Sequence, residues 1–289
     1  IEHPSSSREI EGVMSATGSA AGGPTYQTLT VHRDSEGNAA VAEIQLSRPE
    51  LLNRFDDALH HELIAAIEEV TRDEGVLAVV LSSTGKYFSA GGDTEIMLAA
   101  AKDTQVRMAM LDNGRRLFRA LADFPKPLVV ALAGDTFGLG ATVVLLGDAV
   151  VTAPDVKIAD THVRMGLVAG DGGAVAWPVN MPLARAKRHL LTGDPLTGAE
   201  AHQFGLVSDL VADRSEVRPA ALALAARLAD LPPLAVQLTK RALNKYLSSH
   251  TDDVLDLGFY LEAITMGSAD MLEAIAAFQE KRPGRWTGR

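Results

Sequence analysis

The chain contains no cysteine among its 289 residues. It therefore has no disulfide, no thiolate nucleophile and no cysteine-ligated metal. No apolar run approaches the roughly 18 residues that a transmembrane helix needs, so we expect no membrane span. An excess of basic residues is also missing, because the net charge is −10, which argues against nucleic acid as a main partner. A cytoplasmic location is the simplest expectation.

Aromatic residues are scarce at 5%, whereas hydrophobic residues reach 47% of the chain. This composition suits an α/β protein in which helices pack closely on a sheet. Strand-like apolar runs alternate with helical patterns, which predicts crossover connections and mostly parallel pairing. Residues 1–24 are rich in Ser, Gly and Ala without an apolar period, and we expect a flexible extension there. We predict an α/β core over residues 25–215 and a helical region over residues 216–289.

A short run of small residues, YFSAGGD at positions 87–93, follows an apolar run at 76–81 that predicts a buried strand. Glycine permits the unusual backbone angles of such a turn, and Asp93 is expected to cap the helix that follows. A strand that ends in this kind of turn can aim free backbone N–H groups at a ligand oxygen. The alternative is a plain connection between a strand and a helix.

A second corner has the same design. An apolar run at 128–132 predicts a strand, which leads into AGDTFGLGA at 133–141 and then into another apolar run. The pattern is again a strand, a glycine-rich turn and the start of a helix. Two such corners can supply two convergent N–H donors, which is the arrangement of an oxyanion hole.

Three runs together resemble the crotonase (enoyl-CoA hydratase/isomerase) superfamily: KYFSAGGD, AGDTFGLGATVVLLGDAVVTA and LARAKRHLLTGDPLTGAEAHQFGLVSDLV. The resemblance extends from about Tyr26 to the C-terminus. It implies a spiral of ββα units and a C-terminal helical region that assembles homotrimers or hexamers. It also implies an oxyanion hole, formed by the backbone N–H groups of Gly92 and Leu139, that holds the thioester oxygen of an acyl-CoA as it becomes an enolate. CoA would arrive as part of the substrate, and neither a separate cofactor nor a metal is expected.

The sequence departs from this family at the two glutamates that its hydratases use. The resemblance places Thr142 and His162 at those positions. Threonine cannot act as a base, so hydration by two glutamates is in doubt. Histidine titrates near neutral pH and can serve as acid or base. Asp171 can fix the tautomer of His162 and stabilise the imidazolium, which would leave the other ring nitrogen to activate water.

The pattern of His162, GDG at 170–172 and Trp177-Pro178 resembles the β-diketone hydrolase branch of the superfamily, typified by 6-oxocamphor hydrolase. In that branch a His–Asp pair promotes the attack of water on a ketone, and a C–C bond breaks. Three functions therefore stay open: an acyl-CoA enzyme, a β-diketone hydrolase and a non-catalytic acyl-CoA binder. The plainer alternative for the pair is a polar loop histidine and an N-cap aspartate, Asp171.

Other residues are predicted to contact the substrate or its CoA moiety, by position in the family or by chemistry: Leu51, Leu52, Lys86, Ala90, Gly138, Trp177, Phe278 and Lys281. The alternatives to substrate binding are structural: a strand-to-helix connection at Leu51, a core position for Trp177 and a solvated helix end at Lys281. The adjacent His60 and His61 point about 100° apart on a helix, which favours solvated or capping roles over a shared metal.

Overall fold

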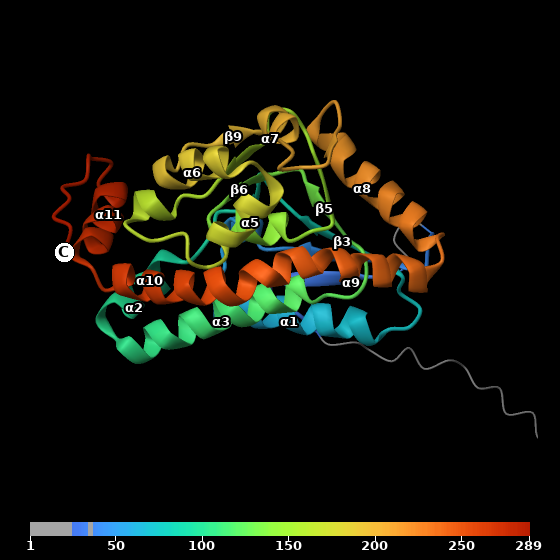
Figure 1. Cartoon of the computed structure of the whole chain (residues 1–289), viewed down its shortest axis with the longest axis horizontal. Helices are drawn as coiled ribbons and strands as arrows, with labels where there is room; N and C mark the ends of the chain where they lie inside the picture. Colours follow the sequence, from blue (N-terminus) through green and yellow to red (C-terminus); the bar gives the residue numbers. More distant parts are fainter. Residues whose placement is uncertain (1–24, 34–36) are drawn as a thin grey trace, which may run out of the picture.

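The computed structural model describes residues 25–33 and 37–289, and Figure 1 shows their arrangement. The predicted N-terminal extension, residues 1–24, lies outside the described residues. Among the described residues, no single helix is long and apolar enough to cross a membrane. The bent pair Arg214–Ala229 and Pro233–Met266 passes that test jointly, by length and composition only.

The larger sheet has six strands in the order β1-β2-β3-β5-β7-β10. Only the β1–β2 pair is antiparallel, as the strand–helix alternation predicted. The central strands are buried along almost their whole length, which is why they read as continuous apolar runs. The strands are β1 (Leu29–His32), β2 (Val41–Leu46), β3 (Ala78–Ser83), β5 (Leu128–Leu132), β7 (Ala149–Thr152) and β10 (Asp209–Leu210).

A second, four-stranded sheet has the order β4-β6-β8-β9. β3, β5 and β7 of the larger sheet each lead directly into β4, β6 and β8 of the smaller one, so successive ββα units build the expected crotonase-like spiral. β6 falls inside the stretch that the sequence predicted to be only a turn. The strands of this sheet are β4 (Tyr87–Ser89), β6 (Asp135–Phe137), β8 (Lys157–Ala159) and β9 (Leu196–Thr197).

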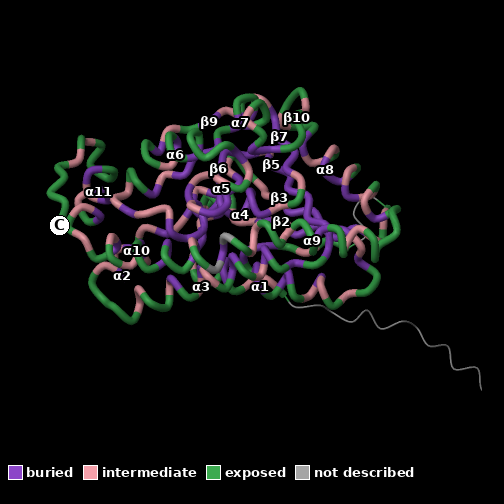
Figure 2. The backbone as a smooth tube through the Cα atoms, in the orientation of Figure 1, coloured by how far each residue is buried: buried purple, intermediate pink, exposed green. Residues whose placement is uncertain are grey.

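Helices cover these sheets, and Figure 2 shows the buried backbone concentrated between them. Several helices begin at an aspartate or serine whose side chain accepts a first-turn N–H, as at Asp56 and Asp93. The helices are α1 (Asp57–Arg72), α2 (Thr94–Lys102), α3 (Thr104–Ala122), α4 (Leu139–Leu145), α5 (Gly173–Asn180), α6 (Leu183–Thr192), α7 (Gly198–Phe204), α8 (Arg214–Ala229), α9 (Pro233–His250), α10 (Asp256–Met266) and α11 (Ala269–Gln279).

The C-terminal helices α9 and α10 pack against α3. The π-helical turn η3 (Thr251–Leu255) joins α9 to α10, and the two run on as one long rod beside α3 (Figure 1). The predicted helical region over residues 216–289 thus contains one continuous helical path from α9 to α10. The role of this region in assembling subunits stays a prediction.

Candidate functional site

The two glycine-rich corners lie next to each other, because β4 and β6 are neighbouring parallel strands. Gly91 and Gly138 have φ angles of 91° and 52°, a region that only glycine adopts freely. A Cβ added to Gly91 would lie 3.0 Å from the carbonyl oxygen of Phe137 and 3.8 Å from the Cα of Gly138. The small residues are therefore needed because two backbone segments touch here.

Gly92 and Leu139, the two residues predicted to form the oxyanion hole, both have a free backbone N–H group. Leu139 is the first residue of α4, where backbone N–H groups have no partner within the helix. Gly92 sits in an isolated bridge with Phe55, whose own N–H donates to the oxygen of Gly91. Across residues 25–33 and 37–289, neither the Gly92 nor the Leu139 N–H meets an intramolecular acceptor. Both groups are available to a ligand oxygen.

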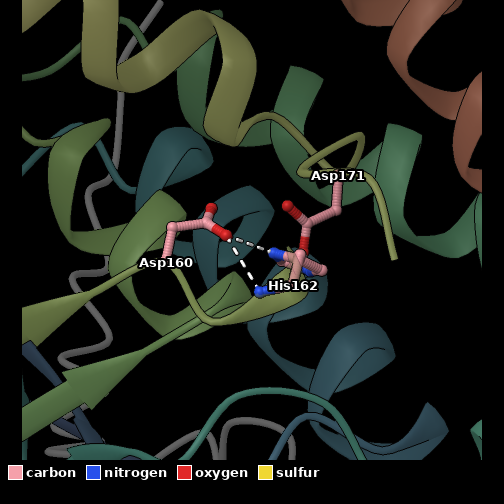
Figure 3. A group of neighbouring side chains, drawn as sticks. All are labelled: Asp160, His162 and Asp171. Carbon is pink, nitrogen blue, oxygen red and sulfur yellow. Dashed lines mark hydrogen bonds and ion pairs between the residues drawn. The ribbon is translucent and has the colours of Figure 1, made fainter. Parts of the chain in front are cut away.

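His162 is clamped between two carboxylates (Figure 3). Its Nδ1 lies 2.7 Å from Oδ1 of Asp160, and its Nε2 lies 3.0 Å from Oδ2 of Asp171. The backbone N–H of His162 also donates to Oδ1 of Asp160 over 3.1 Å. The contact between His162 and Asp171, which the sequence could not show, is thus present in the structure. Asp160 occupies the second nitrogen, so the expectation that this nitrogen faces water was wrong.

We call Asp160, His162 and Asp171 the clamp. Three short elements of the chain bring these residues together. Asp160 follows β8 directly, and His162 opens the 3-10 turn η2 (His162–Met165). The second oxygen of Asp160, Oδ2, packs against the start of α5, where a Cβ on Gly173 would collide with it. A glycine at this first helical residue therefore lets the carboxylate approach the positive end of the helix.

Asp171 lies in the turn before α5 but does not cap that helix. The N-cap is Gly172, at φ 116°, and no side chain caps it. The alternative role of Asp171 as an N-cap was therefore wrong. The Oδ1 of Asp171 instead faces the hydroxyl of Thr142, with 3.4 Å between the oxygens. Thr142 thus contacts the carboxylate of Asp171.

The charges around His162 decide its protonation. Burial by itself would lower the pKa of His162, but the negative charges and hydrogen bonds of Asp160 and Asp171 outweigh it and raise that pKa well above its ordinary value. The raised pKa favours the imidazolium form, in which both ring nitrogens carry a proton. The clamp holds one positive and two negative charges.

The clamp borders the second corner. A Cβ added to Gly138 would lie 3.6 Å from Cε1 of His162. The ring therefore lies against the backbone of Gly138, the residue before Leu139. A positive ring beside two free N–H groups favours the accumulation of negative charge on a ligand oxygen at this place.

Asp160, His162 and Asp171 are also residue types that bind metals, and their potential ligand atoms lie within 4.8 Å of one another. Both ring nitrogens are already engaged by carboxylates, however, and a metal would need one of them deprotonated and free. The imidazolium supplies the positive charge that an ion would bring. The arrangement therefore fits an ion-paired triad better than a metal centre.

Sequence reasoning missed two members of this cluster. Asp160 lies in the same loop as His162 but was given no role, because its proximity to the ring depends on the tight turn at η2. Glu262 lies on α10 and is 3% exposed. Burial first, and then the charge of Asp171, raise the pKa of Glu262 to about 8. No spacing in the sequence links Glu262 to the other residues.

The residues predicted to bind substrate fall into separate groups. The loop with Leu51 and Leu52 touches the first corner, since the N–H of Ala90 donates to the carbonyl of Leu52 over 3.0 Å. Lys86 is exposed, with its Nζ 5.5 Å from the ring of Tyr87. A third group stands at the exposed end of α11 and consists of Phe278 and Lys281. Their contacts with CoA stay predictions.

Two aromatic positions differ from expectation. Trp177 was predicted to line the acyl pocket, but its side chain is 0% exposed and stacks on the ring of His189. Its burial supports the core role that was the alternative. His60 is buried rather than solvated, and its Nδ1 lies 2.8 Å from the carbonyl oxygen of Asp56. Trp177 lies in α5, a helix that the sequence did not predict because Pro178 inside it lacks an N–H to donate.

Comparison with known proteins gives consistent matches. The enoyl-CoA hydratase/isomerase family model matches residues 36–289. The 1,2-epoxyphenylacetyl-CoA isomerase of Escherichia coli K12 is 32% identical, over 86% of this chain and 95% of that protein. The 2,3-dehydroadipyl-CoA hydratase of the same organism is 29% identical, over 85% and 94%. A crystal structure of an enoyl-CoA hydratase/isomerase from Mycobacterium paratuberculosis superposes with a TM-score of 0.80 at 32% identity, over 87% and 98% of the two chains.

Proposed function

Because the chain belongs to the enoyl-CoA hydratase/isomerase (crotonase) family, we propose that it acts on an acyl-CoA thioester through an enolate. The observation that carries this proposal is the pair of free N–H groups, on Gly92 and Leu139, at adjacent corners beside the His162 imidazolium. Donors aimed at a developing oxyanion are worth about 3–4 kcal/mol each in the transition state. The names of the E. coli relatives, an isomerase and a hydratase of CoA thioesters, support the substrate class.

Proton transfer is assigned to the pair of His162 and Asp171. In the proposed reaction the Asp171 carboxylate takes a proton from a carbon of the acyl chain, and the electron pair moves to the thioester oxygen. Asp171 then returns a proton to a different carbon, so the double bond shifts and no atom leaves the substrate. When the proton on Asp171 exchanges with solvent before it returns, the reaction in D₂O places deuterium in the product. The imidazolium balances the charge throughout. A single carboxylate beside the neutral Thr142 suits this isomerisation better than a hydration that needs two carboxylates.

The test is the conversion of a 3-enoyl-CoA into the conjugated 2-enoyl-CoA, followed by absorbance, together with deuterium uptake from D₂O by mass spectrometry. Leu139→Pro removes one hole donor and is compatible with the first residue of a helix. Leu139→Ala is the matched control, because it shortens the same side chain and keeps the N–H. We expect Leu139→Pro to be about 100-fold slower than Leu139→Ala.

Two outcomes would count against the proposal. One is the absence of isomerisation and of deuterium uptake for acyl chains of several lengths. The other is an equal rate for Leu139→Pro and Leu139→Ala. Should His162→Ala keep its affinity for acyl-CoA and lose turnover, the protein is an enzyme. An unchanged rate would remove His162 from the chemistry, and affinity without any turnover in the wild type would favour the non-catalytic binder.

A second candidate is the β-diketone hydrolase, favoured by the 3.0 Å contact between His162 and Asp171. Against it stands Asp160, which occupies the ring nitrogen that a water-activating histidine would need. Incubation with a cyclic 1,3-diketone in the absence of CoA distinguishes the two. Ring opening to a keto acid would favour the hydrolase, and we expect none.

A further inference from the structure

Glu262 is a buried carboxyl group without a partner. Its residue is 3% exposed, and its Oε2 is enclosed by protein atoms. Within the described part of the chain, neither carboxyl oxygen makes a hydrogen bond or an ion pair. An ionised carboxylate in such a place would lose its hydration and gain nothing in return, so the group stays protonated. A buried carboxyl group without a hydrogen-bond partner lowers the stability of the fold, so its presence needs an explanation.

The helix that carries Glu262 packs directly on the turn that carries Asp171. A Cβ added to Gly170 would lie 2.7 Å from the Cβ of Glu262 and would collide with the carbonyl oxygen of Gly258. The two backbones touch at this glycine, with no side chain between them. This close approach places Glu262 next to the turn that carries Asp171.

The charged groups that face Glu262 all belong to the clamp. Asp171 and Asp160 repel a negative charge on Glu262, whereas the imidazolium of His162 attracts it. On the neighbouring elements α2, α3, η3 and α11, the charged side chains that the structure describes are exposed to solvent or bound elsewhere, among them Glu95, Lys102, Arg107, Arg115, Asp253, Asp270 and Glu273. Among the described side chains, the charges that act on Glu262 are therefore those of the clamp.

We propose that Glu262 is a positioning residue that sets the charge state of the clamp: the His162–Asp171 pair transfers protons while Glu262 is neutral and stops when Glu262 ionises. An ionised Glu262 adds a third carboxylate to the two that already hold the imidazolium. His162 keeps its proton, but a new negative charge beside Asp171 favours the protonated form of that group, so Asp171 returns an accepted proton to the substrate less readily. The return of the proton is the step that slows.

The direction of the pH dependence follows from this arrangement. Burial and the charge of Asp171 raise the pKa of Glu262 to about 8, so the group is neutral at pH 7 and mostly ionised at pH 9. Activity should therefore fall as pH rises through about 8. A shuttle limited only by deprotonation of a histidine would gain activity over the same range. The plot of activity against pH around pH 8 therefore slopes in opposite directions for the two models.

The first experiment needs no substrate. Nitrogen chemical shifts of ¹⁵N-histidine are followed by NMR from pH 6 to pH 10, with the His162 signals identified by their loss in His162→Gln. In the wild type we expect both nitrogens to stay protonated at neutral pH and to shift with a midpoint near pH 8. Glu262→Gln, which is neutral at every pH, should lose that midpoint. Glu74→Gln, the same change at an exposed glutamate, should keep it.

The second experiment is kinetic and rests on the proposed function. The isomerisation rate of the wild type should fall about tenfold between pH 7 and pH 9, whereas that of Glu262→Gln should stay within about twofold. Superimposable His162 titrations in the wild type and Glu262→Gln would overturn the inference. If Glu262→Gln does not fold, the infrared band of a protonated carboxyl in the wild type decides, since its absence at pH 7 also overturns it. A protein that isomerises no thioester but shows the NMR midpoint refutes the proposed function, and the control of the charge state of the clamp by Glu262 still stands.

Discussion

Replacing Asp160 by asparagine removes one charge from the clamp and almost no volume. The carboxylate lies 2.7 Å from the ring of His162 and also accepts its backbone N–H. An asparagine can still accept through its side-chain oxygen, so the substitution isolates the charge. Removing one partner of a buried ion pair destabilises a protein by about 3–5 kcal/mol. Because Asp171 remains on the other nitrogen, we expect the lower end of that range.

The loss should depend on pH in a defined direction. The pKa of His162 is raised by folding, so the stabilisation from its ion pairs is fully present below the unfolded pKa of about 6.5. This stabilisation is lost as pH rises through the folded pKa, because the folded state then no longer binds the extra proton. Asp160→Asn should therefore cost about 3 kcal/mol at pH 6 and clearly less at pH 10.

Urea unfolding at both pH values measures this difference. Asp155→Asn is the control, because Asp155 is an exposed aspartate that pairs with Arg214 and should contribute at most about 1 kcal/mol. A loss below about 1 kcal/mol at pH 6, or a larger loss at pH 10 than at pH 6, would falsify the view that Asp160 holds a charged imidazole.

Three further substitutions test interactions that stabilise the fold. Gly172→Ala places a Cβ at φ 116° and against the ring of Phe118, so we expect at least about 2 kcal/mol of destabilisation in thermal unfolding; a wild-type stability would contradict the strain. Arg218→Met removes the bidentate partner of the buried Glu43 and should lower the free energy of unfolding in urea by about 3 kcal/mol. A much smaller loss would mean that the hydrogen bond from Ser82 is enough to stabilise the Glu43 carboxylate. Thr197→Ala removes the cap of α7 and should cost about 1 kcal/mol by the same assay, and no loss would mean that water replaces the cap.

Features encoded by local pattern could be predicted from the sequence. The apolar runs of the central strands and the small residues of the two corners each depend on a few neighbouring positions. The structure confirms the α/β spiral, the strand at 128–132 and the N-cap role of Asp93. The free N–H groups of Gly92 and Leu139 follow from the same local patterns, because a glycine turn before a helix leaves its donors unpaired.

Features that depend on distant packing could not be predicted. Glu262 reaches the clamp only because α10 lies on the turn at Gly170, and no periodicity encodes that contact. Asp160 was missed since a carboxylate two residues from a histidine usually points elsewhere, and here a tight turn redirects it. Trp177 was misplaced because an aromatic residue in an apolar helix looks the same whether it faces a ligand or the core.

The clamp also restricts movement. A histidine that relays protons by rotating its ring must exchange a nitrogen for a carbon at each of its two binding positions. In His162 both nitrogens are bound to carboxylates that are themselves buried, so half a turn of the ring would break two ion pairs at once. The imidazolium therefore keeps one orientation between Asp160 and Asp171 while Asp171 exchanges protons with the substrate. The timing of proton transfer is then set by the carboxylates and their surroundings, and not by rotation of the imidazole.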